Sequence, residues 1–230
     1  MDFRLNPVAL VTGAASSVGA ACAATLAARA RGGLIMVDAD EAGLSNAADA
    51  LAAPPERVST LAFSAADSER WQHAAAFLNA QYGRLDWALA CFPTDPAASP
   101  GDILTLTDTL ARLMKPNTQG GAIVLVFPDA PARAEHVAQL VRLANKESGA
   151  RVRVCAVVRE AETALWRNDA SFEALVRECG DENAALLKLA GLEQPLARCQ
   201  AGAALPALAD MLLASDADGV TLVVDASPAL

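Results

Sequence analysis

One stretch near the start of the chain constrains the fold more than any other: Val8–Gly19, an apolar run that ends in a turn of small residues. Val8–Val11 are four consecutive apolar residues, which is typical of a strand buried on both faces of a parallel sheet. Gly13 and Gly19 flank a turn of alanine and serine, and Ala20–Ala30 is rich in helix-forming residues. Such a strand, turn and helix direct unpaired backbone N–H groups to one point, where a phosphate can bind. A plain strand–helix unit, whose glycines serve only close packing, explains the same residues.

A second apolar strand is predicted at Leu34–Val37, and it ends at Asp38. A carboxylate at this position can accept hydrogen bonds from both ribose hydroxyls of an adenosine, which favours NAD over the 2′-phosphate of NADP. The two segments together therefore predict a dinucleotide-binding unit.

These segments resemble the short-chain dehydrogenase/reductase family, whose first turn reads Thr-Gly-x-x-x-Gly-x-Gly. The turn of this chain matches the motif at Thr12, Gly13, Val18 and Gly19, while Ser17 stands where the middle glycine is usual. The resemblance extends to Asp225 through the segments before the later strands. It implies that any cofactor-binding residues are Gly13, Ser17, Val18, Gly19 and Asp38.

Strand and helix patterns alternate along the chain, which indicates an α/β fold of the Rossmann type. We expect one domain, residues 1–230, with a doubly wound parallel sheet and helices on both faces. Further strands are predicted at 58–63, 85–91, 121–127, 151–158 and 220–225, and helices at 41–52, 67–82, 101–115, 132–148 and 205–214. Residues 160–203 are polar and partly helical, and the resemblance implies that they form a lobe over the substrate.

Composition limits the classes of partner. The net charge of −9 disfavours nucleic acid and anionic membrane surfaces. No apolar run is long enough to span a membrane, and the first residues do not resemble a signal peptide. The five cysteines are scattered, and the only histidines are His73 and His136, so we expect no metal site. These features favour a cytoplasmic protein with reduced thiols.

The catalytic motif of the family is absent from this sequence. Its active members use Tyr-x-x-x-Lys on the helix after the fifth strand, because the lysine lowers the pKa of the tyrosine hydroxyl. The only tyrosine here is Tyr82, which precedes the fourth strand, and none of the three lysines follows it by four residues. Alignment on the later helix puts Ala130 and Ala134 near the positions of that pair. We therefore predict no catalytic residues in this chain.

Family motifs around the cofactor are also altered. The Asn-Asn-Ala-Gly after the fourth strand corresponds to Ala90–Pro93, which includes Phe92, and the adenine-binding aspartate after the third strand corresponds to Ser64. The Pro-Gly that lines the nicotinamide corresponds to Arg159-Glu160, and a carboxylate is unfavourable beside a pyrophosphate. Any binding of NAD is therefore expected to be vestigial.

Other candidate residues have simpler interpretations. Cys91 at a strand end is expected to be a small core residue, because no histidine lies near it in the sequence. His136 is interpreted as a surface residue. Glu160 and Glu162 do not face each other if this segment is helical. The tryptophans Trp71, Trp87 and Trp166 are interpreted as packing residues.

Three hypotheses about function follow. The first is a non-catalytic subunit of a hetero-oligomeric, NAD-dependent dehydrogenase, in which an active sister subunit oxidises a secondary alcohol; by analogy of fold, that alcohol is a 3-hydroxyacyl-CoA, as in anaerobic toluene degradation. The second is an active, divergent oxidoreductase that uses Asp129 or Cys91 as acid and base. The third is a sensor of adenine nucleotides without chemistry.

The helix predicted at 132–148 is the candidate interface with a sister subunit. Its apolar stripe Val137, Leu140, Val141 and Ala144 is expected to face the sheet. Ala134, Ala138 and Leu143 are expected to face the partner, with Ala138 in the seam. The family resemblance implies that the last strand, 220–225, also contributes to assembly.

Overall fold

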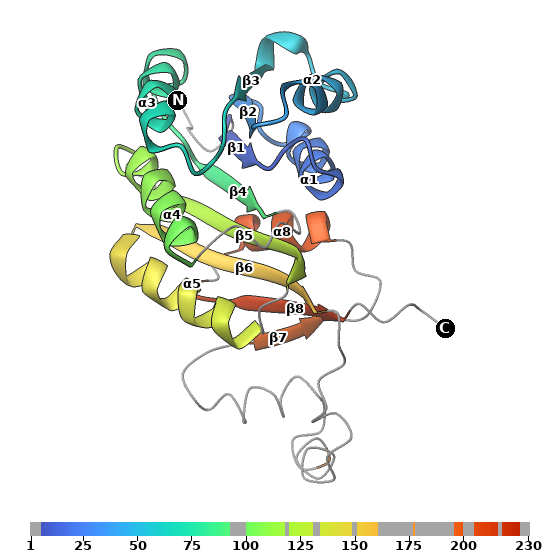
Figure 1. Cartoon of the computed structure of the whole chain (residues 1–230), viewed down its shortest axis with the longest axis vertical. Helices are drawn as coiled ribbons and strands as arrows, with labels where there is room; N and C mark the ends of the chain where they lie inside the picture. The colour runs from blue at the N-terminus through green and yellow to red at the C-terminus, as the bar shows by residue number, and fades with distance from the viewer. Residues whose placement is uncertain are drawn as a thin grey trace.

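The computed structural model describes residues 6–92, 100–117, 120–130, 134–148, 151–160, 177, 196–199, 205–215 and 218–225. Within them lies one parallel sheet of eight strands in the order β3-β2-β1-β4-β5-β6-β8-β7. The strands are β1 (Val8–Thr12), β2 (Gly33–Asp38), β3 (Val58–Ala62), β4 (Trp87–Cys91), β5 (Gly121–Ala130), β6 (Val152–Glu160), β7 (Leu196–Cys199) and β8 (Thr221–Asp225). The chain winds outward from β1 to β3 and then continues from β4 on the other side of β1 (Figure 1). The predicted Rossmann-type, doubly wound α/β fold is confirmed.

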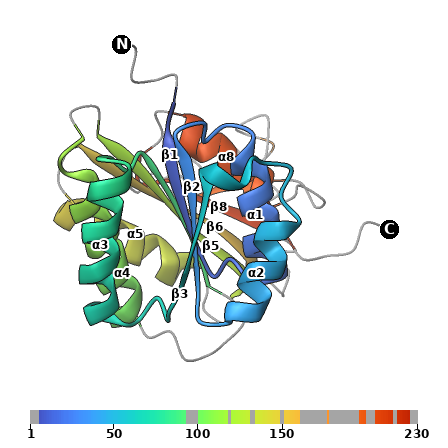
Figure 2. The ribbon, with the colours of Figure 1, turned by 90° about the horizontal axis from the view of Figure 1, so that it is seen from above.

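Helices cover both faces of the sheet (Figure 2). One face carries α3 (Ser68–Gln81), α4 (Pro100–Met114) and α5 (Ala134–Ser148), and the other carries α1 (Ser17–Ala27), α2 (Glu41–Asp49) and α8 (Leu205–Ala214). The short 3-10 helix η2 (Pro55–Arg57) leads into β3. Because strand side chains alternate in direction, each central strand contributes to both cores.

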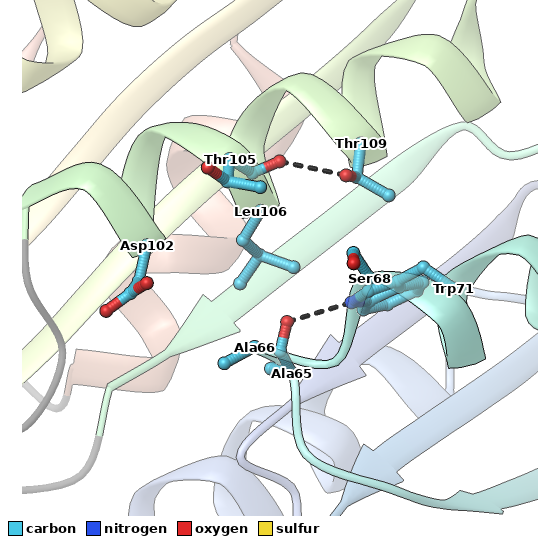
Figure 3. Close-up of a pocket in the computed structure, with 8 residues that line it drawn as sticks. All are labelled: Ala65, Ala66, Ser68, Trp71, Asp102, Thr105, Leu106 and Thr109. Atoms are coloured by element: carbon cyan, nitrogen blue, oxygen red, sulfur yellow. Dashed lines mark hydrogen bonds between the residues drawn. The ribbon is translucent and has the colours of Figure 1, made fainter.

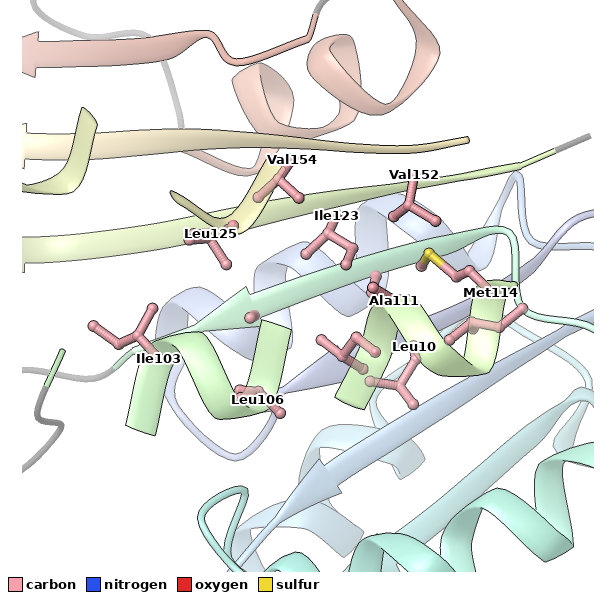
Figure 4. Packing of buried hydrophobic residues seen from close by; sticks show 14 of the residues in the cluster. Leu10, Ile103, Leu106, Ala111, Met114, Ile123, Leu125, Val152 and Val154 are labelled. Atoms are coloured by element: carbon pink, nitrogen blue, oxygen red, sulfur yellow. The ribbon is translucent and has the colours of Figure 1, made fainter. Parts of the chain in front are cut away.

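Strand β1 shows how the two cores are divided. Leu10 packs on the side of α3, α4 and α5, whereas Ala9 and Val11 pack on the side of α1, α2 and α8. On the first side, Leu106 and Met114 of α4 lie over the sheet beside Leu10 (Figure 4). The sheet is therefore buried on both faces, as its apolar strands predicted.

Several element boundaries differ from the sequence-based prediction. Helix α1 begins at Ser17 and ends at Ala27, whereas 20–30 was predicted, because the side chain of Ser16 caps its first turn. Strand β5 continues through an irregularity to Ala130. Strand β6 ends at Glu160, which pairs with Ala130 on one side and Asp225 on the other. The helical interpretation of Glu160 was therefore wrong.

The segment predicted as a substrate lobe, 160–203, lies mostly outside the described residues. Its described part includes β7, which pairs in parallel with β8 as the edge strand of the sheet. Strand β8 is thus paired on both sides, by β6 and β7. The contribution of the last strand to assembly stays a prediction.

Candidate functional site

The carboxyl ends of β1 and β4 meet at the point where the winding direction of the sheet reverses, which is where ligands of this architecture bind. The turn after β1 passes directly over the end of β4 there. Gly13 has a φ of +67°, and a Cβ on it would overlap the carbonyl oxygen of Cys91. A Cβ on Gly19 would overlap the carbonyl oxygen of Gly13. Both glycines are therefore required by close packing, whether or not a cofactor binds.

Ser16 organises this turn, and the sequence analysis did not single it out. Its hydroxyl donates to the carbonyl oxygen of Gly13 at 2.7 Å and accepts from the N–H of Gly19 at 3.0 Å. The N–H groups of Ser17 and Val18 have no acceptor within the described residues. The preference of serine for helix N-caps was the signal that could have identified it.

The predicted cofactor residues at the start of α1 have unequal surroundings. The side chain of Ser17 is exposed, whereas that of Val18 is half-buried and packs against the core beneath α1. Their two N–H groups point out of the helix N-terminus, where the helix dipole favours an anion. The turn thus keeps the polar backbone groups of a phosphate site.

Asp38, at the end of β2, forms a hydrogen bond with the same turn. Its Oδ2 accepts from the N–H of Ala15 at 2.9 Å, and its Oδ1 accepts from the N–H of Asp40 at 3.0 Å. An ionised carboxylate has about four acceptor positions, so these bonds leave room for ribose hydroxyls. Asp38 and the glycine turn are brought together as predicted, and Asp38 has a structural role that the sequence did not indicate.

Two aromatic rings lie at the carboxyl ends of β4 and β5. Phe92 and Phe127 stack with their ring centroids 4.9 Å apart and their planes within 12°. The N–H of Phe92 donates to the carbonyl oxygen of Val126 at 2.9 Å, which holds the chain after β4 against β5. Phe127 is 9% exposed, and Phe92 is half-buried. The sequence suggested the bulk of Phe92, but its partner was not predicted.

Cys91 at the end of β4 packs on the opposite face of the sheet, with α1, α2 and α8, and is 3% exposed. A hydrogen bond with the thiol of Cys22, together with burial, raises the pKa of Cys91 well above its ordinary value. The thiol therefore stays protonated at neutral pH and is a poor nucleophile or base. The interpretation of Cys91 as a core residue is confirmed.

Tyr82 lies at the opposite edge of the sheet. Its ring packs against Gly33 at the start of β2, and its hydroxyl is 2.8 Å from the hydroxyl of Ser59 on β3. The only tyrosine of the chain is thus far from the carboxyl ends of β1 and β4, as its position in the sequence predicted.

A shallow hollow lies between α4 and the segment that leads into α3 (Figure 3). It is lined by Ala65, Ala66, Ser68, Trp71, Asp102, Thr105, Leu106 and Thr109. Its volume of about 20 Å³ suits a single water molecule rather than a nicotinamide ring. None of the predicted cofactor residues lines it.

For some candidate residues the structure gives no contact that supports a functional role. Ser64 is exposed and accepts from the N–H of Ala66 at 3.3 Å. The side chains of Asp129, His136 and Glu160 lie outside what the structure describes, as do all of Glu162 and Trp166. Across the described ranges, no group of three histidine, cysteine, aspartate or glutamate side chains is placed to hold a metal ion.

Ala138 corrects the predicted interface on α5. It is 6% exposed and belongs to the inner side of the helix with Val137, Val141 and Ala144. Leu143 is 48% exposed and lies on the outer side. The expectation that Ala138 lies in a seam with a partner was wrong, because the chain itself already buries this residue.

Comparison with known proteins agrees with this geometry. Residues 7–91, from β1 to β4, match the family model described as short chain dehydrogenase. A solved short-chain dehydrogenase/reductase (glucose/ribitol dehydrogenase) from Brucella melitensis aligns over 100% of both chains, with 16% identity and a TM-score of 0.63. The fold is that of the short-chain dehydrogenases. No curated protein matches the chain.

Two further structures share the short-chain dehydrogenase fold. A Burkholderia xenovorans protein assigned to the short-chain dehydrogenases/reductases is 25% identical, with 96% of each chain covered and a TM-score of 0.62. Carveol dehydrogenase from Mycobacterium avium, solved in complex with NAD, is 22% identical; 97% of this chain and 98% of that chain align, with a TM-score of 0.55. Within the described residues, no helix is both long and apolar enough to cross a bilayer.

Proposed function

We propose that this chain is a non-catalytic member of the short-chain dehydrogenases/reductases, and that it supports an active sister subunit that oxidises a secondary alcohol. The observation that carries the proposal is the stack of Phe92 on Phe127, which occupies the carboxyl ends of β4 and β5. It stands in a sequence that contains no Tyr-x-x-x-Lys motif.

Alcohol oxidation needs a group that accepts the hydroxyl proton while hydride leaves the carbon. Among the described side chains near the end of β4, Cys91 does not suit this role, because its raised pKa keeps the thiol protonated. Tyr82 does not suit it either, because its hydroxyl lies at the other edge of the sheet beside Ser59. These positions support the absence of proton transfer by this chain.

The residues present fit one end of NAD better than the other. The glycine turn and Asp38 offer N–H groups and a carboxylate suited to a phosphate and a ribose. The end that would hold the nicotinamide does not fit, because two stacked apolar rings replace a polar turn there. We therefore propose that binding of NAD is vestigial in this chain, and no step of a reaction is derived through it.

The test measures turnover and binding separately. The purified chain is assayed with NAD and a panel of secondary alcohols, and we expect no turnover. Calorimetry with NAD is expected to give binding weaker than about 1 mM, compared with micromolar values for a working site. Turnover that is lost in Cys91→Ala or Asp129→Ala would establish the divergent oxidoreductase instead.

A second function is distinguished by the same calorimetry. The bonds from Asp38 to the turn favour a site for the adenosine half alone. Binding of AMP or ADP-ribose at micromolar concentration, lost in Asp38→Ala and without turnover, would establish the sensor of adenine nucleotides.

A further inference from the structure

We propose that Phe92 sets the ligand selectivity of this site, because its ring occupies the surface on which a nicotinamide ring would stack. The residue beneath it is Phe127 of β5, and the two rings form the stack described above. This inference rests on the proposed function and deepens it by naming the side chain that excludes one class of ligand, the nicotinamide dinucleotides.

Pairing of β4 with β5 fixes the position of the stack. Cys91 pairs in register with Val126, so Phe92 and Phe127 are the next residues along two neighbouring strands. The N–H of Phe92 donates to the carbonyl oxygen of Val126 at 2.9 Å, which continues the contact beyond the end of β4. The rings therefore lie at the carboxyl ends of the strands, where ligands of this architecture bind.

The structure holds the two rings unequally. Phe127 is 9% exposed, belongs to the core on the side of α3, α4 and α5, and pairs through its backbone with Val158 of β6. Phe92 is half-buried, follows the last residue of β4, and packs against the same core from outside. Loss of the Phe127 ring would open the core, whereas loss of the Phe92 ring uncovers one face of Phe127.

The face of Phe127 that Phe92 covers suits a nicotinamide ring. Both are flat six-membered aromatic rings, and aromatic rings stack at the separation seen here, 4.9 Å between centroids. Oxidised nicotinamide also carries a positive charge, which the face of an aromatic ring attracts. The Phe92 side chain and a nicotinamide therefore compete for the same surface.

The adenosine end of the site does not depend on Phe92. The carboxylate of Asp38 accepts from the N–H groups of Ala15 and Asp40, and these bonds involve neither ring of the stack. The N–H groups of Ser17 and Val18 belong to the turn after β1. Removal of the Phe92 ring is therefore expected to change the affinity for the nicotinamide half of NAD alone.

The experiment compares NAD with ADP-ribose, which has the same adenosine end but no nicotinamide. Calorimetry on the wild-type chain is expected to show that NAD binds no more tightly than ADP-ribose. In Phe92→Ala, NAD is expected to bind at least about tenfold more tightly than in the wild type, and ADP-ribose is expected to change by less than about twofold.

Two variants serve as controls. Phe92→Leu keeps apolar bulk over Phe127 and is expected to bind NAD as weakly as the wild type does. Phe77→Ala removes a ring that is 36% exposed and packs edge-on against Tyr82, and it is expected to leave both affinities unchanged. Circular dichroism of each variant checks that the fold is kept.

A second measurement needs no variant. Saturation-transfer NMR on the wild type with millimolar NAD is expected to show transfer to the adenine protons and little to the nicotinamide protons. Equal transfer to both rings would overturn the proposal, and so would an unchanged affinity for NAD in folded Phe92→Ala. Either result would leave the absence of turnover in the wild type, which tests the proposed function, as a separate observation.

Discussion

Gly13 lies where the turn after β1 passes over the end of β4. An alanine at this position is unfavourable for two reasons. Its φ of +67° is strained for other residues, and a Cβ would overlap the carbonyl oxygen of Cys91. We expect Gly13→Ala to lower the free energy of unfolding by more than the roughly 1–3 kcal/mol of the backbone strain alone. Urea unfolding measures this change.

Gly83 provides the matched control for Gly13. It has the same φ of +67°, but a Cβ there would meet only the carbonyl oxygen of Asn79 at 4.0 Å. Gly83→Ala therefore measures the cost of the backbone conformation without the overlap. Equal losses of stability in the two variants would show that the turn can move away from β4.

The raised pKa of Cys91 predicts that the stability of the fold decreases at alkaline pH. Its hydrogen bond with Cys22 and its burial raise its pKa above the ordinary value of 9.0, and burial also raises the pKa of Cys155. At pH values between the pKa of a thiol in the unfolded chain and its higher pKa in the folded chain, the unfolded chain has lost the thiol proton, whereas the folded chain retains it. Stability is therefore fully present below about pH 9 and falls as the pH rises through this window.

The measurement is chemical unfolding at a series of pH values above 8. Cys91→Ala is expected to lower stability at neutral pH and to flatten the alkaline decline, and Cys91→Ala with Cys155→Ala is expected to flatten it further. An unchanged alkaline slope in the double variant would assign the decline to other groups.

Among the elements, α5 is tied to β6 by one side chain. The amide of Asn145 donates to the carbonyl oxygen of Val154 at 2.9 Å and accepts from its N–H at 2.7 Å. Strand β8 pairs with β6 only from Ala156 onward. At Val154, the Asn145 side chain therefore makes the two hydrogen bonds that a neighbouring strand would make. Asn145 is thus a structural residue of the helix–sheet contact.

We expect Asn145→Ala to destabilise the fold by about 1–3 kcal/mol, because the N–H of Val154 loses its acceptor in a buried strand. The carbonyl oxygen keeps a second donor, the N–H of Gly219 at 3.1 Å. Gln139→Ala, an exposed change on the same helix, is the control and should alter stability little. Thermal unfolding of both variants measures the difference, and equal melting temperatures would contradict this role.

At the scale of the whole molecule, the outer side of α5 is the candidate contact with a sister subunit. Among residues 137–146 of α5, the exposed side chains are Gln139, Arg142, Leu143 and Lys146. Because Leu143 is the apolar residue among them, we place the sister subunit of the proposed function there.

Purification of the tagged chain from its native cells tests this assembly. We expect a second short-chain dehydrogenase/reductase that contains an intact Tyr-x-x-x-Lys motif to co-purify with the chain. Leu143→Glu should remove that protein, because it puts a carboxylate into an apolar contact, while Gln139→Glu at the rim should retain it. Loss of the partner in both variants, or in neither, would exclude Leu143 as the contact.

The sequence by itself determined the features that depend on neighbouring residues. The apolar run and glycines of 8–19 predicted strand, turn and helix. The helix predicted at 67–82 is α3, and its first predicted residue, Asp67, caps it by accepting from the N–H groups of Glu69 and Arg70. Alternation of apolar strands with helices predicted a doubly wound sheet, because only helices on both faces bury such strands. The absence of Tyr-x-x-x-Lys is likewise a property of the sequence alone.

Only the tertiary structure decided which distant residues meet. Phe92 and Phe127 belong to different strands, and their stacking follows from the pairing of β4 with β5. The inward direction of Ala138 depends on how α5 rotates over the sheet, and the bond from Asp38 to Ala15 depends on how β2 lies beside β1. Periodicity along one segment does not carry this information, because contacts between segments depend on the register and packing of the whole sheet.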